Sequence, residues 1–158
     1  MEKDSTLNYR SGVLAVIYRE DKFLLIRKNG RPEDEWYFAA GGKENAESSE
    51  TTFYREMKEE LSIEPDDLKN AQVTRITHRY TWGEEMKKKT GFDGQAQKVV
   101  FAELKDGDRV RVNDEEEIDS FRFETAEELV STLPFQNLRD LVQDLKKADE
   151  SPLVFDKV

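Results

Sequence analysis

Three glutamates, Glu56, Glu59 and Glu60, stand at spacings i, i+3 and i+4 in one segment of the sequence. On a helix with about 3.6 residues per turn, these spacings place all three carboxylates on one face. Like charges at these spacings cost about 0.2–0.5 kcal/mol per pair, and a divalent cation would offset that repulsion. Oxygen ligands without histidine or cysteine favour Mg²⁺ or Mn²⁺ over zinc. The triple therefore predicts a hard-cation site, although alone in an acidic chain such a triple is more often a solvated helix face.

A helix that ends near Leu61 would carry these glutamates. Ser48 or Ser49 can cap its beginning, because a serine side chain accepts a hydrogen bond from the first free backbone N–H groups. Phe53, Met57 and Leu61 recur at i, i+4 and i+8 and form an apolar stripe beside the acidic face. We expect this stripe to pack against a sheet and so to hold the carboxylates in place.

Composition narrows the possible chemistry. The chain has 25 Lys and Arg against 35 Asp and Glu, which gives a formal net charge of -10. This balance argues against binding to duplex DNA or to an anionic membrane, but it leaves a local anion site possible. Without cysteine and with one histidine, disulfides, thiolate catalysis and multi-histidine metal sites are excluded. We assign that histidine, His78, no role, since a lone strand histidine is more often structural.

Length and hydropathy predict one cytoplasmic domain over residues 1–158. A chain of this size is long enough for one real core. The longest apolar stretch, Gly12–Tyr18, has 7 residues. Crossing a bilayer takes roughly 20, and the acidic-polar start does not resemble a signal peptide. The tail at 148–158 either docks on the domain or stays loose.

Apolar patterning predicts an α+β fold in which helices cover the faces of a mixed sheet. Strands are expected at Gly12–Tyr18, Lys22–Arg27, Trp36–Ala40, Ala71–Trp82, Gln97–Leu104, Arg109–Val112 and Ile118–Phe123. The first two strands form a hairpin, and a tight turn at 105–108 predicts a second hairpin.

Turn residues and capping signals fill the spaces between these strands. Polar loops are expected at Asn29–Glu35, at Gly83–Gly94 and at the acidic run 113–117. Thr125–Glu128 has the spacing of a capping box for a short helix that Pro134 ends. A final amphipathic helix is expected over 137–147.

A longer pattern surrounds the three glutamates. It is Gly41-x5-Glu47-x7-Arg55-Glu56-Met57-x-Glu59-Glu60-x-x-Ile63. Average residue usage predicts a chance match on the order of one in a million for a chain of this length. The pattern resembles the Nudix box, in which a glycine stands where this chain has Ser62. That glycine ends the helix in a left-handed conformation, so the serine should cost roughly 1 kcal/mol there.

This resemblance implies a fold, a cofactor and residue roles. The fold is the Nudix α/β/α sandwich, and the cofactor is Mg²⁺, with Mn²⁺ as a possible substitute. The implied metal ligands are Glu56, Glu59, Glu60 and the Gly41 carbonyl, and catalysis would fall to Glu56 and Glu60, with Glu56 as a possible base. Glu47 and Arg55 would form an ion pair that orients the glycine loop and the helix.

Segments outside the box are similar to bacterial RNA 5′-pyrophosphohydrolases and the related diadenosine polyphosphate hydrolases. The longest is the run Trp36–Ser48, and Tyr9-Arg10, Gly94–Lys98 and Glu117–Phe121 also resemble that subfamily. Alanines at 39 and 40 replace the proline and glutamine of the subfamily pattern.

The subfamily resemblance suggests further site residues. Glu117 would be a fourth carboxylate, acting as metal ligand, catalytic residue or general base, against the alternative of one more solvated acid in a charged run. The other candidates would bind the substrate. Phosphates would be held by Arg10, Arg27 and Lys28, further substrate contacts would come from Gln95, Gln97 and Lys98, and a base would stack on Phe135.

The preferred hypothesis is a Mg²⁺-dependent hydrolase of phosphoanhydride bonds in a nucleoside diphosphate linked to another moiety. Its substrate would be the 5′-triphosphate end of RNA, with release of pyrophosphate, or a dinucleoside polyphosphate. Hydrolysis of ADP-ribose, a nucleotide sugar or a free (d)NTP is the enzymatic alternative. A Nudix-like regulator that binds a nucleotide without cleaving it is the alternative from another class. The sequence leaves both a monomer and a homodimer open.

Overall fold

In the computed structural model, which describes residues 6–113 and 117–158, a six-stranded mixed sheet organises the chain. The strand order is β4 (Leu68–Thr81), β5 (Gly94–Leu104), β1 (Tyr9–Arg19), β2 (Lys22–Lys28) and β6 (Ile118–Thr125), with β3 (Ala39–Gly42) paired to β1 off this path. Strand β1 runs parallel to β5 and antiparallel to β2 and β3, so the sheet is mixed as expected.

The central strand β1 positions the glycine loop. Its residues Val13–Ile17 are buried on both faces, which explains their continuous apolar run. One edge of β1 is shared: residues 12–15 pair with β3, whereas Tyr18 and Arg19 pair with β2. This division brings Gly41 and Gly42, at the end of β3, alongside the middle of the sheet.

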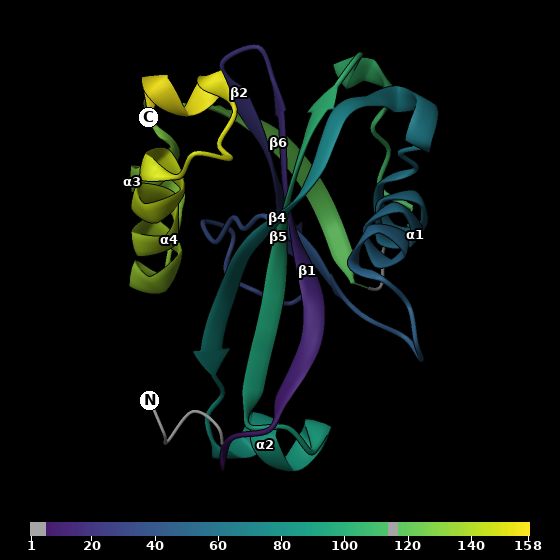
Figure 1. The fold of residues 1–158 in the computed structure, drawn as a ribbon, viewed down its shortest axis with the longest axis vertical. Helices are drawn as coiled ribbons and strands as arrows, with labels where there is room; N and C mark the ends of the chain where they lie inside the picture. The colour runs from purple at the N-terminus through teal and green to yellow at the C-terminus, as the bar shows by residue number, and fades with distance from the viewer. Residues whose placement is uncertain (1–5, 114–116) are drawn as a thin grey trace.

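Helices cover both sides of the sheet, as Figure 1 shows. Helix α1 (Ser49–Leu61) lies on one side, and α3 (Leu129–Thr132) and α4 (Gln136–Lys147) lie on the other. Helix α2 (Glu84–Thr90) sits at the end of the sheet between β4 and β5. Three 3₁₀ turns complete the described elements: η2 (Pro65–Asp67), η3 (Gly107–Arg109) and η4 (Leu153–Lys157). The predicted α/β/α sandwich is confirmed.

Helix α1 begins and ends as its sequence predicts. The Ser48 hydroxyl accepts a hydrogen bond from the Thr51 N–H at 3.1 Å. At the other end Ser62 adopts the left-handed conformation, with φ 59°, and its N–H donates to the Lys58 carbonyl. The Phe53, Met57 and Leu61 stripe is buried, so the opposite side of the helix faces outward.

Two local predictions are wrong, each for a physical reason. The segment predicted as a loop at 83–94 contains α2, whose acidic first turn and Lys87–Lys89 last turn complement the helix dipole. No apolar period marks this short helix. The strand predicted at Arg109–Val112 is absent, because both edges of β5 are already paired, with β1 and with β4. Instead, the Arg111 N–H donates to the Leu61 carbonyl at the end of α1.

The C-terminal segment packs on the sheet through one aromatic ring. Phe155 in η4 is 1% exposed, and its ring contacts Phe23 and Phe101 at centroid distances of 5.2 and 5.6 Å. The acidic run expected as a loop lies, at 114–116, outside the described residues. Within the described part of the chain, none of the helices has the length and apolar character to cross a membrane.

Candidate active site

An ion pair fastens the glycine loop to helix α1. The Arg55 guanidinium donates to both carboxylate oxygens of Glu47, at 2.7 and 2.9 Å, and to the Gly42 carbonyl at 2.9 Å. The Glu47 carboxylate also accepts from the Thr52 hydroxyl and the Glu44 N–H, each at 2.9 Å. These hydrogen bonds, that of Arg55 above all, lower the pKa of Glu47 to about 2. Arg55 and Glu47 thus have the geometry expected of an orienting pair.

The same arginine reaches two of the three glutamates of α1. Its Nη1 lies 3.2 Å from Glu59 Oε1 and 3.5 Å from Glu56 Oε1. The Glu56 carboxyl lies directly against Gly41: a Cβ at Gly41 would stand 2.0 Å from Glu56 Oε2. Any side chain at this position would therefore displace the Glu56 carboxyl.

Glu56 is the acid of this site whose pKa is raised. Burial raises the pKa of Glu56 to about 7, and Arg55 opposes this shift. The charges of Glu59, Glu117 and Glu44 contribute to this rise. The effect of Glu117 on Glu56 means that the loop before β6 and the face of α1 share one electrostatic environment.

The charges of Glu60 and Glu117, which belong to two different elements, act on Lys28. Glu60 is buried on α1, at 5% exposure. Glu117 is held at the end of β2, where its carbonyl accepts from the Asn29 N–H at 2.9 Å. Desolvation lowers the pKa of Lys28, whereas the charges of Glu60 and Glu117 raise it. Lys28 therefore lies between the acidic residues and the aromatic pocket that it also lines.

The donor chemistry of this region fits a hard divalent cation. The candidate ligands are carboxylate oxygens and a backbone carbonyl, and the absence of a Cβ at Gly41 lets the Glu56 carboxyl lie against the glycine backbone. The described side chains do not converge as a closed cage: no group of three described acids or histidines is placed to hold an ion. Arg55 is one reason why these carboxylates do not converge, since it pairs with Glu56 and Glu59.

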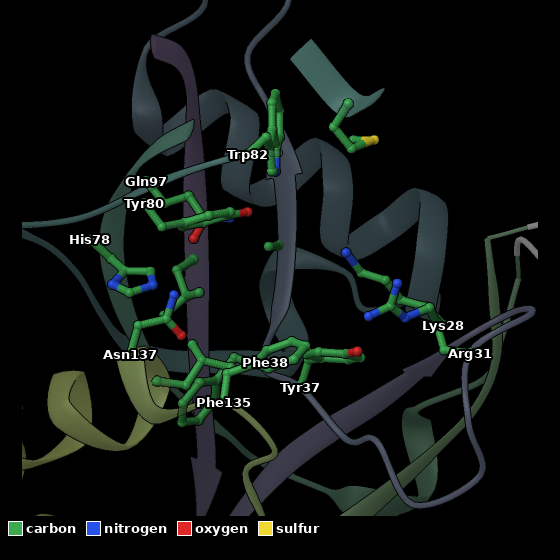
Figure 2. Close-up of a pocket in the computed structure, with 14 residues that line it drawn as sticks. Lys28, Arg31, Tyr37, Phe38, His78, Tyr80, Trp82, Gln97, Phe135 and Asn137 are labelled. Carbon is green, nitrogen blue, oxygen red and sulfur yellow. The ribbon is translucent and has the colours of Figure 1, made fainter. Parts of the chain in front are cut away.

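An aromatic pocket of about 430 Å³ opens beside Lys28 on the α4 side of the sheet (Figure 2). Its rings come from three segments: Tyr37 and Phe38 before β3, His78, Tyr80 and Trp82 on and after β4, and Phe135 before α4. The Tyr37 and Phe135 rings lie 5.6 Å apart. Lys28 and Arg31 stand at one side of the pocket, and His78 and Asn137 stand at the other.

Three predicted substrate residues line this pocket: Lys28, Gln97 and Phe135. Gln97 is 4% exposed, and Phe135 keeps 40% of its surface exposed. Gln95 lies two residues before Gln97 on the same face of β5 and accepts a hydrogen bond from the Tyr80 hydroxyl at 2.8 Å.

The other predicted substrate contacts lie outside the pocket lining. The Arg10 guanidinium lies over Gly42, 2.3 Å from where a Cβ of that residue would stand. Arg27 pairs with Asp119 at 2.9 Å. Lys98 follows Gln97 on β5, so its side chain leaves the opposite face of the strand.

Sequence reasoning missed several lining residues, His78 among them. His78, Tyr80 and Trp82 alternate along β4 and just beyond it, and their neighbouring rings lie 5.4 and 6.3 Å apart. Side chains at alternate positions lie on one face of a strand, so the spacing of these three residues could have predicted that they line one wall of the pocket. Arg31 and Asn137 had no comparable signal, because only the fold brings their loops together.

A Nudix box on a helix that covers one side of a mixed sheet, in a three-layer sandwich, defines the class of this domain. The NUDIX domain family matches residues 8–145, and the chain belongs to this family as a Nudix hydrolase.

Relatives and solved structures agree with this assignment. An RNA pyrophosphohydrolase of Campylobacter jejuni subsp. doylei is 27% identical over 127 residues, which cover 77% of this chain and 81% of the relative. An RNA pyrophosphohydrolase of Halorhodospira halophila is 32% identical, covering 66% of this chain and 59% of that protein. The structure of the E. coli dihydroneopterin triphosphate pyrophosphohydrolase has a TM-score of 0.70 at 18% identity, covering 87% of this chain and 96% of the other. A C. elegans Ap4A hydrolase structure gives 0.66 at 20% identity, with 85% and 93% coverage.

Proposed function

We propose that this Nudix hydrolase is a Mg²⁺-dependent pyrophosphohydrolase that acts on the 5′-triphosphate end of RNA or on dinucleoside polyphosphates. The observation that carries the proposal is the position of Lys28 between the aromatic pocket and the acidic face. Its Nζ lies 5.6 Å from the centroid of the Tyr37 ring, and the charges of Glu60 and Glu117 act on it. A substrate with a base and a polyphosphate needs both environments side by side.

The aromatic pocket suits a nucleobase. Stacking on an aromatic ring is worth about 1–3 kcal/mol per base, and Phe135 and Tyr37 form one wall for such stacking. Gln97 and Asn137 supply amide groups that can hydrogen-bond the edge of a base. With its base in the pocket, a nucleotide would direct its phosphates towards Lys28 and Arg31.

The acidic face supplies the groups for hydrolysis. Glu56, Glu59, Glu60, Glu117 and the Gly41 carbonyl are the residues that would hold Mg²⁺. When bound, the cation neutralises phosphate charge and favours deprotonation of a water molecule. Either Glu117 or Glu56 accepts that proton as general base.

The remaining box residues hold the acidic face in register with the glycine loop. Arg55 and Glu47 fix the loop against α1 through the two hydrogen bonds described above.

In the proposed reaction the water oxygen becomes bonded to phosphorus, and the anhydride bond to the bridging oxygen breaks. From a triphosphorylated RNA the products are pyrophosphate and a 5′-monophosphorylated strand.

A substrate panel tests this proposal. The protein is incubated with Mg²⁺ and, separately, with a 5′-triphosphorylated oligoribonucleotide, diadenosine tetraphosphate, ADP-ribose and each dNTP, and the products are identified by mass. We expect the RNA end or the dinucleotide to be cleaved fastest, with no turnover when the metal is chelated. Cleavage of ADP-ribose alone would contradict the proposed substrate class.

A non-catalytic nucleotide-binding regulator is the candidate from another class. Such a module should have lost box ligands, whereas this chain keeps all three glutamates and Arg55. Calorimetry that detects nucleotide binding in Mg²⁺ without any release of phosphate would favour the regulator instead.

A further inference from the structure

A second cavity lies away from the aromatic pocket, at the turn between β1 and β2. Its volume is about 680 Å³, within the usual range for ligand pockets. The wall comes from that turn, from the 107–111 segment and from β6, and the lining residues are Arg19, Glu20, Lys22, Gly107, Val110, Arg111, Phe121 and Phe123.

The lining of this cavity is cationic. The charged residues that line it, among those the structure describes, are Arg19, Lys22, Arg111 and Glu20. The Arg19 guanidinium is fixed by donating to the Lys105 carbonyl at 2.7 Å. In a chain with a formal charge of -10, this local excess of positive charge favours an anionic ligand.

The floor of the cavity is aromatic. Phe121 and Phe123 lie two residues apart on one face of β6, with ring centroids 6.2 Å apart and the rings nearly perpendicular. Both rings are only partly buried, so a planar group can stack on one ring and contact the edge of the other. Aromatic rings beside arginines are the elements that bind a ring carrying a phosphate.

Gly107 keeps this floor open. A Cβ at this position would stand 3.6 Å from two carbons of the Phe123 ring and 3.8 Å from the Arg19 side chain. These are ordinary contact distances, so the backbone tolerates a side chain there. A large side chain at Gly107 would extend over the rings and compete with a ligand.

The segment that lines the cavity is also bonded to the end of the catalytic helix. The Arg111 N–H donates to the Leu61 carbonyl, and the Asn113 N–H donates to the Glu60 carbonyl, both at 2.9 Å. The Asn113 side-chain amide donates to the Glu59 carbonyl at 3.1 Å. A change in this segment would therefore be felt by the residues that carry the acidic face.

We propose that this cavity is a second binding site, for a nucleoside monophosphate, and that its occupancy acts on the end of α1. The base stacks on one of the two rings, Phe121 or Phe123, and contacts the edge of the other, and the phosphate pairs with Arg19 and Arg111. The 107–113 segment transmits the change to α1 through its hydrogen bonds to the Glu60 and Leu61 carbonyls.

An NMR titration localises the ligand without relying on catalysis. AMP is added to the ¹⁵N-labelled protein in the presence of EDTA, so that no turnover occurs, and backbone amide shifts are followed. We expect saturable shifts at Gly107, Val110 and Arg111, accompanied by shifts at Leu61 and Ser62. Shifts at the Trp82 indole report the aromatic pocket separately, so failure of the proposed active site and failure of this second site give different results.

Matched variants and ligands decide the outcome. Gly107→Leu should abolish the AMP-dependent shifts at residues 107–111. Arg111→Gln should raise the Kd obtained from these shifts at least tenfold, whereas Phe135→Ala should leave that Kd unchanged. Adenosine and inorganic phosphate should each bind at least tenfold more weakly than AMP. The proposal is overturned by an absence of shifts at 107–111, by shifts that stop short of Leu61, or by phosphate binding as tightly as AMP. Because Arg111 is exposed, Arg111→Gln remains informative if Gly107→Leu fails to fold.

Discussion

Helix α1 and the aromatic pocket differ in how far apart in the sequence their parts lie. The ion pair of Glu47 with Arg55 and the three glutamates of α1 fall within residues 47–60, in one helix and the loop before it. The pocket combines residues from position 14 to position 138, which only the sheet brings together. We infer that the glutamates of α1 are positioned by local sequence, whereas the approach of Glu117 and the choice of substrate depend on tertiary structure.

The largest effect should follow from removing a carboxylate of α1. Glu60→Gln keeps the shape of this buried side chain but removes its negative charge. Loss of a group that stabilises charge in the transition state costs about 10²–10³-fold in kcat, and we expect a loss of this size with Mg²⁺ present. Glu50→Gln, an exposed change on the same helix, is the control. Near wild-type turnover by Glu60→Gln would show that the catalytic assignment is wrong.

A change in the pocket should act on binding rather than on the chemical step. Phe135→Ala removes a ring from the Tyr37 wall, and a loss of about 1.4 kcal/mol of stacking corresponds to a tenfold rise in KM. We expect this rise with kcat changed less than about threefold in steady-state assays. Leu153→Ala, which truncates an 83% exposed apolar side chain of η4, should change neither constant. If kcat fell instead, the division between the two regions would not hold.

The ion pair that holds the α1 region together should make its stability depend on pH. The folded-state pKa of Glu47, about 2, lies below its ordinary value of 4.5. Glu47 therefore stabilises the folded state fully above about pH 4.5, and this contribution is lost as the pH falls towards 2. In urea unfolding, Glu47→Gln should be less stable than the wild type at pH 7, and the difference should shrink between pH 4.5 and 2. A difference that stays constant over this range would mean that the charge of Glu47 is not what stabilises the loop.

The same contrast explains what the sequence could and could not predict. The stripe of Phe53, Met57 and Leu61 and the cap at Ser48 identify α1 because helical spacing is a local property. The prediction of a strand at Arg109–Val112 was wrong because the pairing of such a strand depends on which partners β5 already has. Asn137 and Arg31 could not be placed in one pocket without knowing the fold, since neither carries a signal in its own segment.

The smallest effect concerns Ser62, the one departure from the Nudix box. This residue adopts φ 59°, a conformation that glycine reaches without strain from a Cβ, and it leads into the buried Ile63. Ser62→Gly should therefore raise the free energy of unfolding by about 0.5–1 kcal/mol, measured by urea denaturation. Because the change affects only the end of α1, KM for the substrate should stay constant. A loss of stability would instead mean that the serine side chain contributes more than the left-handed backbone costs.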